Sequence, residues 1–183
     1  ITGMVIRHGE AFTIPDHLTV WEGDQAVYRP TVHYAYCPTD AAIASLRELE
    51  HRNWDLTENQ RIMNDEIIDG NDRLGVLLMG HPYKSWWTGS LLSIHDSRKL
   101  IPNQSATTVQ VASAVFAAVA WVVKNPDKGL LVPDDMPWRE VLAYAEKYWG
   151  GFHSAPADWT PIDNRTDFFE GWNGKEYDSD PWQ

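Results

Sequence analysis

Cysteine and basic residues are scarce in this sequence of 183 residues. The single cysteine, Cys37, cannot form an internal disulfide, which fits a reducing compartment, so we expect a cytoplasmic protein. The 15 lysines and arginines stand against 26 aspartates and glutamates, giving a net charge of −11. Nucleic acid requires a basic surface and is therefore not an expected partner. The acidic balance permits cationic partners, or it serves solubility alone.

Several motifs that carry chemistry are also missing. The sequence has neither G-x-G-x-x-G nor G-x-x-x-x-G-K-[ST], so it lacks a phosphate cradle for a nucleotide. It has no G-x-S-x-G nucleophile elbow, and no H-x-x-x-H or C-x-x-C pair, so we expect no metal site. His33 and Cys37 are four residues apart on or near a strand, where that spacing does not converge on a metal. No apolar run approaches the ~20 residues of a membrane span, and no secretory signal is visible.

What the chain does contain is a globular composition. Hydrophobic residues make up 43% of it, and ten tryptophans offer large areas for burial or for contact with ammonium groups. The length suffices for one domain with a core. The chain starts at Ile1, in a segment typical of a strand, so we expect a fragment of a longer polypeptide.

The first 65 residues predict short strands followed by one helix. β-Branched and aromatic runs predict a first strand over residues 2–7, which residues 11–14 would continue. A second strand is predicted at 18–21, and a third at 26–28 and 31–37, interrupted at Pro30. A helix is predicted from Thr39 or Asp40 to about Glu50, because Ile43, Leu46 and Leu49 follow helical spacing.

The central segment predicts an antiparallel hairpin. The apolar runs Leu74–Met79 and Trp86–Ile94 flank a turn that contains Gly80 and Pro82. Neither run alternates between apolar and polar residues, as a strand with one solvent-exposed face does, so both faces of the hairpin should be covered. A helical turn is expected at residues 95–101.

The C-terminal part predicts helices and an extended tail. The helix over residues 106–124 has apolar residues around nearly its whole circumference and should be buried on most sides. A short strand at 130–132 and a helix from Pro137 to about Trp149 follow. From Ala155 the chain should be extended and held to the body by aromatic rings. The fold class is therefore α+β, a mixed, largely antiparallel sheet with helices packed on it, with residues 1–154 as the core and 155–183 as the tail.

Two groups of polar residues are candidates for a site. His8 and Glu10 flank Gly9 at a strand end, where residues two apart share a face. Such a pair can move a proton or hold an amine; the alternative is a polar strand end that faces water. The carboxylates before the hairpin, Glu66, Asp69 and Asp72, can hold a cation or simply form a turn.

For a further histidine and two tryptophans, a role in packing is a better explanation than a role in a site. His33 is expected to be a hydrogen-bonded core or interface histidine. Trp86 and Trp87 point to opposite faces of a strand, so at most one can line a pocket, and core packing explains both.

Long collinear segments of the chain resemble bacterial homospermidine synthases. The matching segments are Tyr28–Tyr36, Glu66–Gly70, Leu74–Leu78, Gly89–Ile94, Gln104–Val111, Asp158–Pro161 and Ser179–Gln183. These segments follow the same order and similar spacing as in that family. They correspond to the C-terminal part of its proteins.

The resemblance implies a fold and an activity. The fold would be the substrate and dimerisation domain of a saccharopine dehydrogenase-like protein, following a Rossmann domain that this chain lacks. The family uses bound NAD to couple two putrescine molecules into sym-homospermidine with release of ammonia. A homodimer in the cytoplasm is implied, with no nucleic acid or membrane partner, and the isolated chain would turn nothing over.

The same resemblance implies roles for the candidate residues. The segment around His8 and Glu10 is similar to one that supplies a histidine and a glutamate to the diamine pocket. Glu10 would hold an ammonium group, and His8 would position the amine or relay a proton. Asp69 and Asp72 match an acidic stretch that is a candidate for substrate binding. Gly9 stands where a bulkier polar residue is expected, which changes the geometry of that pocket.

Two other interpretations remain open at this level. One is a related saccharopine-type reductase that acts on another amine or aldehyde. The other is a non-catalytic module for dimerisation or polyamine binding.

Overall fold

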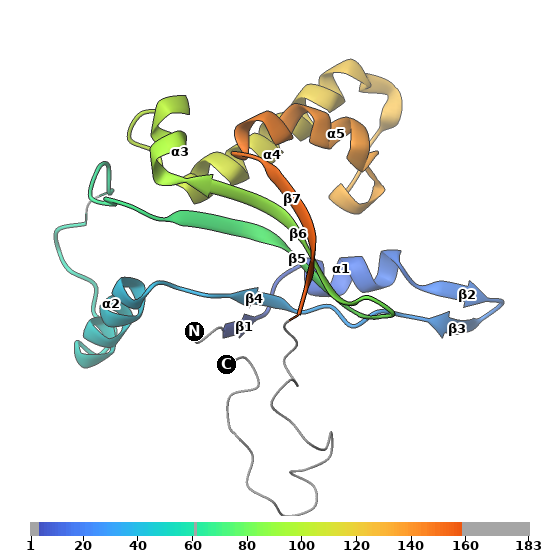
Figure 1. The fold of residues 1–183 in the computed structure, drawn as a ribbon, viewed down its shortest axis with the longest axis horizontal. Helices are drawn as coiled ribbons and strands as arrows, with labels where there is room; N and C mark the ends of the chain where they lie inside the picture. Colours follow the sequence, from blue (N-terminus) through green and yellow to red (C-terminus); the bar gives the residue numbers. More distant parts are fainter. Residues whose placement is uncertain (1–3, 61, 159–183) are drawn as a thin grey trace, which may run out of the picture. The chain divides into compact units, whose positions relative to one another are not determined.

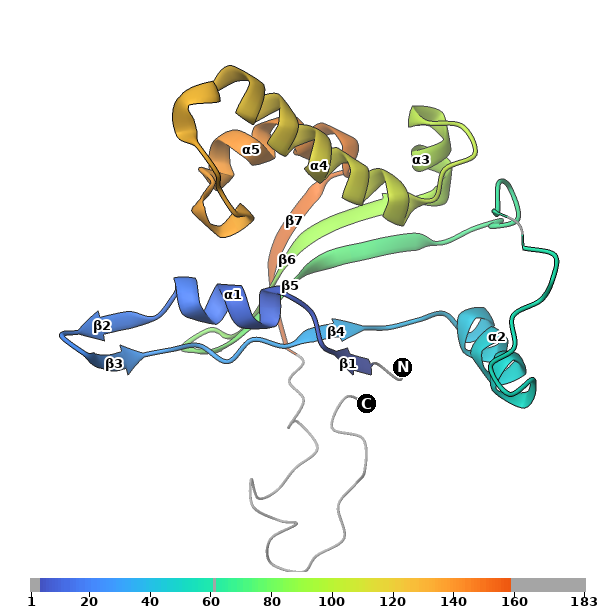
Figure 2. The ribbon, with the colours of Figure 1, turned by 180° about the vertical axis from the view of Figure 1, so that it is seen from behind.

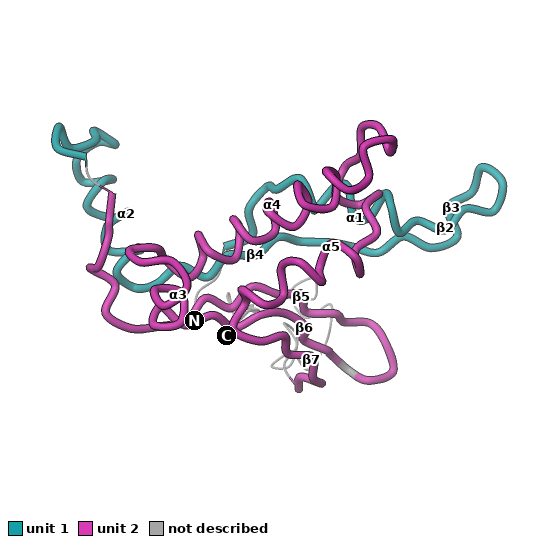
Figure 3. The backbone as a smooth tube through the Cα atoms, turned by 90° about the horizontal axis from the view of Figure 1, so that it is seen from above, with its two compact units in different colours: residues 1–60, 161–183 teal, residues 61–160 magenta. Residues whose placement is uncertain are grey.

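The structure, a computed structural model, describes residues 4–60 and 62–158 in two compact units. The first unit comprises residues 1–60 and 161–183, and the second comprises residues 61–160 (Figure 3). Both contain helices and small antiparallel sheets, so the α+β prediction is confirmed. The division into a core over residues 1–154 and a tail stays a prediction, and the tail from Trp159 lies outside the described residues.

Short strands of the first unit pair two by two (Figure 1). The strands are β1 (Met4–Ile6), β2 (Val20–Glu22), β3 (Gln25–Tyr28) and β4 (Tyr34–Tyr36). β1 runs antiparallel to β4, and β2 runs antiparallel to β3, which confirms these four predicted strand segments with bounds that differ by up to three residues. Ile6 lies opposite Tyr34, and this register brings the residues that follow β1 close to the start of β4.

Helix α1 (Glu10–His17) corrects the prediction that Ala11–Ile14 continue a strand. Gly9 already has helical angles, φ −56° and ψ −42°, and Glu10 places a negative charge in the first turn. The apolar run at residues 11–14 is too short for its period to distinguish a strand from a helix.

Helix α2 (Asp40–His51) forms as predicted. The hydroxyl of Thr39 accepts a hydrogen bond from the backbone N–H of Ala42 at 3.2 Å, which satisfies one free donor of the first turn. No side chain of α2 is fully buried, so its predicted apolar stripe is only partly covered.

The second unit contains a three-stranded antiparallel sheet in the order β5-β6-β7. The strands are β5 (Asn71–His81), β6 (Lys84–Ser93) and β7 (Phe152–Ala157). β5 and β6 form the predicted hairpin, with Gly80 at φ +86° before the turn. No strand was predicted at β7: the sequence analysis ended a helix at about Trp149 and expected an extended tail from Ala155.

Helices α3 (Ile94–Leu100), α4 (Ala106–Lys124) and α5 (Trp138–Ala145) follow the hairpin. Figures 1 and 2 show α4 and α5 on one side of the sheet. The bounds of α4 were predicted correctly, whereas the strand expected at residues 130–132 is irregular chain.

Burial around α4 and β5 differs from the prediction. One face of α4 is buried, and its residues are Ala106, Val109, Gln110, Ser113, Ala117 and Trp121. The opposite face is exposed, with Val115 at 59% and Val123 at 74%. Three side chains of β5 are also about half exposed, those of Leu74, Val76 and Leu78. The prediction that both faces of the hairpin are covered is therefore wrong within this chain. An apolar composition shows how much surface can be buried, but not whether a partner within the chain covers it.

By length and composition, α4 also passes a test for membrane-spanning helices, with a mean hydropathy of 1.8. This corrects the expectation that no apolar segment approaches that length. The core helix of a globular protein can have the same length and composition. In this structure α4 packs on the sheet and buries the polar side chain of Gln110, whose Nε2 donates to the hydroxyl of Ser90 at 2.7 Å.

Gly75 and Gly89 lie opposite each other in the β5–β6 ladder, where the two backbones approach closely. A Cβ atom on Gly89 would lie 2.4 Å from the Cα of Gly75 and 2.4 Å from the carbonyl oxygen of Leu74. These contacts are with backbone atoms, which cannot turn away as a side chain can. The hairpin therefore requires glycine at this position.

We predict that Gly89→Ala lowers the free energy of unfolding of the second unit by at least about 2 kcal/mol, because the added methyl group must displace backbone. Urea unfolding of the full-length protein measures the change. Gly9→Ala is the matched control, since a Cβ there meets nothing within 4 Å. Equal stability of the two variants would contradict the close approach.

Candidate functional site

His8 and Glu10 lie side by side at the start of α1. His8 precedes the helix and Glu10 is its first residue. The Nδ1 of His8 and the Oε2 of Glu10 form a hydrogen-bonded ion pair. Their side chains are 44% and 52% exposed, so solvent reaches both. The two side chains meet as predicted, but the start of a helix brings them together in place of a strand end.

The environment of Glu10 favours its ionised form. Partial burial raises the pKa of the Glu10 carboxyl, but three effects outweigh it. A backbone hydrogen bond within Glu10, the side-chain hydrogen bond with His8 and the charge of His8 together lower the pKa below its ordinary value of 4.5. Glu10 is therefore a carboxylate at neutral pH.

A third side chain, that of Tyr34, completes this cluster. The rings of His8 and Tyr34 are stacked, with centroids 4.2 Å apart and an angle of 15° between their planes. Tyr34 begins β4, and the ladder with β1 places it beside the residues that follow Ile6. The sequence analysis did not single out Tyr34. Only the pairing register of β1 and β4 reveals the contact, and a single sequence does not fix that register.

Asp69 and Asp72 belong to the second unit and do not point to a common partner there. Asp69 precedes β5, and its Oδ1 lies 3.3 Å from the Nε2 of His95, which the sequence analysis also did not single out. Asp72 lies within β5 opposite Leu92. Among the described residues, no group of three or more histidine, cysteine, aspartate or glutamate side chains has the arrangement of a metal site.

Glu66, Trp86 and Trp87 have structural partners, whereas His33 is exposed and not the core residue that was expected. A carboxylate oxygen of Glu66 accepts the backbone N–H of Asn64 at 2.7 Å, as in a turn. The indole N–H of Trp86 donates to the hydroxyl of Ser154 in β7 at 2.8 Å. Trp87 lies so near Gly75 that a Cβ there would be 2.8 Å from its ring. The side chain of Trp86 thus links β6 to β7, and the ring of Trp87 lies against the backbone of β5 at Gly75.

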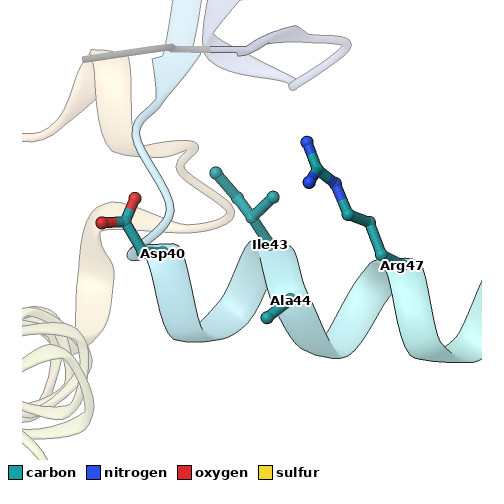
Figure 4. A pocket seen from close by; sticks show the side chains of 4 residues that line it. All are labelled: Asp40, Ile43, Ala44 and Arg47. Atoms are coloured by element: carbon teal, nitrogen blue, oxygen red, sulfur yellow. The ribbon is translucent and has the colours of Figure 1, made fainter.

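A shallow pocket lies along α2 in the first unit (Figure 4). It is lined by Asp40, Ile43, Ala44 and Arg47, all from one helix, with the charged side chains of Asp40 and Arg47 at its two ends. None of the predicted site residues lines it. In the first unit, the best-defined candidate site is the cluster of His8, Glu10 and Tyr34. In the second unit, it is the ion pair of Asp69 and His95.

The first cluster combines three properties that an amine site needs. The carboxylate attracts an ammonium group, and the imidazole can take up or release a proton. Among the described residues, the Nε2 of His8 has no hydrogen-bond partner, so it is the ring atom open to a ligand. The aromatic ring supplies an apolar surface beside them.

Comparison with known proteins identifies the family. Residues 2–151 match the saccharopine dehydrogenase C-terminal domain. A homospermidine synthase from Blastochloris viridis is 41% identical over 99% of this chain, and one from Mesorhizobium japonicum is 40% identical over 99%. The chain spans 38% and 37% of the length of these two relatives.

A solved structure agrees with these relatives. The crystal structure of a homospermidine synthase from Legionella pneumophila in complex with NAD has a TM-score of 0.83 and 37% identity. The similarity covers 99% of this chain and 39% of that one. These similarities confirm the resemblance seen in the sequence: the chain belongs to the family of saccharopine dehydrogenase C-terminal domains.

Proposed function

We propose that this chain is the C-terminal part of a homospermidine synthase. The whole protein would couple two putrescine molecules into sym-homospermidine and release one ammonia, with NAD taking up and returning a hydride. The observation that carries the proposal is the 40–41% identity to homospermidine synthases over nearly the entire chain. The alternative of a reductase for another amine has no specific observation in its favour.

The cluster of the first unit suits a diamine substrate. Putrescine carries two ammonium groups at neutral pH, and the ionised Glu10 offers a carboxylate at the solvent boundary. His8, held by Glu10, would position the amine or transfer a proton at its Nε2. Asp69 and Asp72 of the second unit are further carboxylates that we propose for substrate binding, as the resemblance implies. The net charge of −11 adds a general attraction that weakens with salt.

The glycine-rich fingerprint that holds the pyrophosphate of NAD is missing from this sequence. The similarity covers only 37–39% of its relatives, so a Rossmann domain elsewhere in the polypeptide would hold the cofactor. No step through NAD is assigned to residues of this chain.

The assembly and location follow the same proposal. We propose a homodimer in the cytoplasm, with the Rossmann domain as a partner within the same polypeptide. The half-exposed apolar side chains of β5 and α4 supply surface for such contacts.

The direct test is an assay of the full-length gene product with putrescine and NAD. Formation of homospermidine and ammonia in equal amounts supports the proposal. Turnover of a carboxylated amine without homospermidine would favour the related reductase. Putrescine binding without turnover would favour a binding module. Either result would overturn the proposal.

We predict that Glu10→Gln in the full-length protein raises the KM for putrescine about tenfold, because an amide cannot pair with an ammonium group as a carboxylate does. Steady-state kinetics measures this. Glu22→Gln, which removes an equal charge from β2, is the control and should leave the KM within about twofold. Unchanged KM and kcat in Glu10→Gln would refute the role.

We also predict that the Glu10 carboxyl titrates below pH 4.5 and that His8→Gln moves this titration upward, because the variant removes a hydrogen bond and a charge. Since the folded-state pKa is the lower one, ionised Glu10 stabilises the fold above pH 4.5 and less as the pH falls. Carbon-13 NMR of labelled glutamate and aspartate follows the titration. The pKa of Asp96, lowered by Lys99 and Ser93, should not change.

A further inference from the structure

The imidazole of His8 is held at two places by two different elements. Its Nδ1 pairs with the carboxylate of Glu10, which belongs to the first turn of α1. Its face lies against the ring of Tyr34 from β4, at 4.2 Å and 15°. A carboxylate only accepts hydrogen bonds, so the Nδ1 carries the proton of this bond.

These two contacts fix different degrees of freedom. The imidazole turns about its Cα–Cβ and Cβ–Cγ bonds, and the single hydrogen bond to Glu10 does not by itself fix both torsions. A nearly parallel aromatic ring removes the remaining rotation, because tilting the imidazole would lose the stacking contact. Together they define the direction in which the Nε2 points, which a proton-transferring atom requires.

The stack is a consequence of strand register. Ile6, the last residue of β1, lies opposite Tyr34, and His8 follows two residues later, where its ring stacks on that of Tyr34. A shift of the register by one residue would send the ring of Tyr34 to the other face. The β1–β4 ladder is only three pairs long, yet it places this one aromatic ring under the histidine.

We propose that Tyr34 is a positioning residue for the proposed reaction: its ring fixes the plane of the His8 imidazole, so that the Nε2 meets the amine of the substrate. Tyr34 acts through His8 and needs no contact with the substrate. Its hydroxyl group takes no part, so phenylalanine replaces it. The assignment rests on the proposed function for its kinetic consequence, but its geometric content is independent of that function.

The kinetic test uses three variants of the full-length protein. Tyr34→Phe keeps the ring and should keep kcat and KM for putrescine within about twofold. Tyr34→Leu removes the ring and should lower kcat about tenfold, with a smaller change in KM, because the ground-state carboxylate remains. Tyr36→Leu is the matched control from the same strand, two residues away, and should match the wild type.

A double-mutant cycle separates positioning from general stability. If Tyr34 acts through His8, Tyr34→Leu should cost nothing more in a protein that already carries His8→Gln. An equal loss in both backgrounds would overturn the proposal, and so would a Tyr34→Leu variant that behaves like Tyr36→Leu.

An NMR measurement makes the stack testable without catalysis. In protein labelled at histidine Cε1, the His8 signal is assigned by its loss in His8→Gln. Ring current from Tyr34 should shift its Hε1 resonance upfield, and Tyr34→Leu should abolish this shift while Tyr34→Phe keeps it. A wild-type His8 resonance without an upfield shift overturns the proposal, even if Tyr34→Leu fails to fold. A wild-type protein that makes no homospermidine but shows the shift refutes the function and leaves the contact.

Discussion

The position of β6 between β5 and β7 is the constraint on which the second unit depends. Both edges of β6 are hydrogen-bonded within this unit, and its face carries the core residue Leu92. The buried hydrogen bond from Gln110 to Ser90 then ties α4 to the same strand. Since a buried N–H donor without a partner is costly, this bond from the Nε2 helps to fix how α4 sits on the sheet, in addition to the apolar contacts. The facing glycines of β5 and β6 allow the close backbone approach within that sheet.

The site of the first unit is built with far less support. A ladder of three residue pairs and the first turn of a short helix hold His8, Glu10 and Tyr34 in place. Both members of the ion pair are about half exposed, so solvent screens their attraction. A contribution from stacking is less sensitive to salt than the charge pair, because it depends on surface contact. The cluster thus combines around a single imidazole a contact that salt weakens and one that salt affects less.

Local signals in the sequence were sufficient to predict the elements with a clear cap, a long apolar segment or a glycine turn. Thr39 as a cap, the apolar spacing of α4 and the turn around Gly80 predicted α2, α4 and the hairpin. They were insufficient at residues 11–14, where the sequence Ala-Phe-Thr-Ile fits either a strand or a helix. The exposure of α4 and β5 was missed because it depends on contacts between elements. Spacing alone identified His8 and Glu10 as neighbours, whereas Tyr34 and His95 reach their partners across the fold, and only the structure reveals them.

Gly9, between the two members of the ion pair, has an ordinary helical φ and open space where a side chain would stand. The backbone at this point therefore does not require glycine. Over evolutionary time, single substitutions here can introduce a polar or bulky group beside the pair without any compensating change in the helix. Lineages of this family can in this way diverge in the surroundings of the histidine while the residues that hold it are retained.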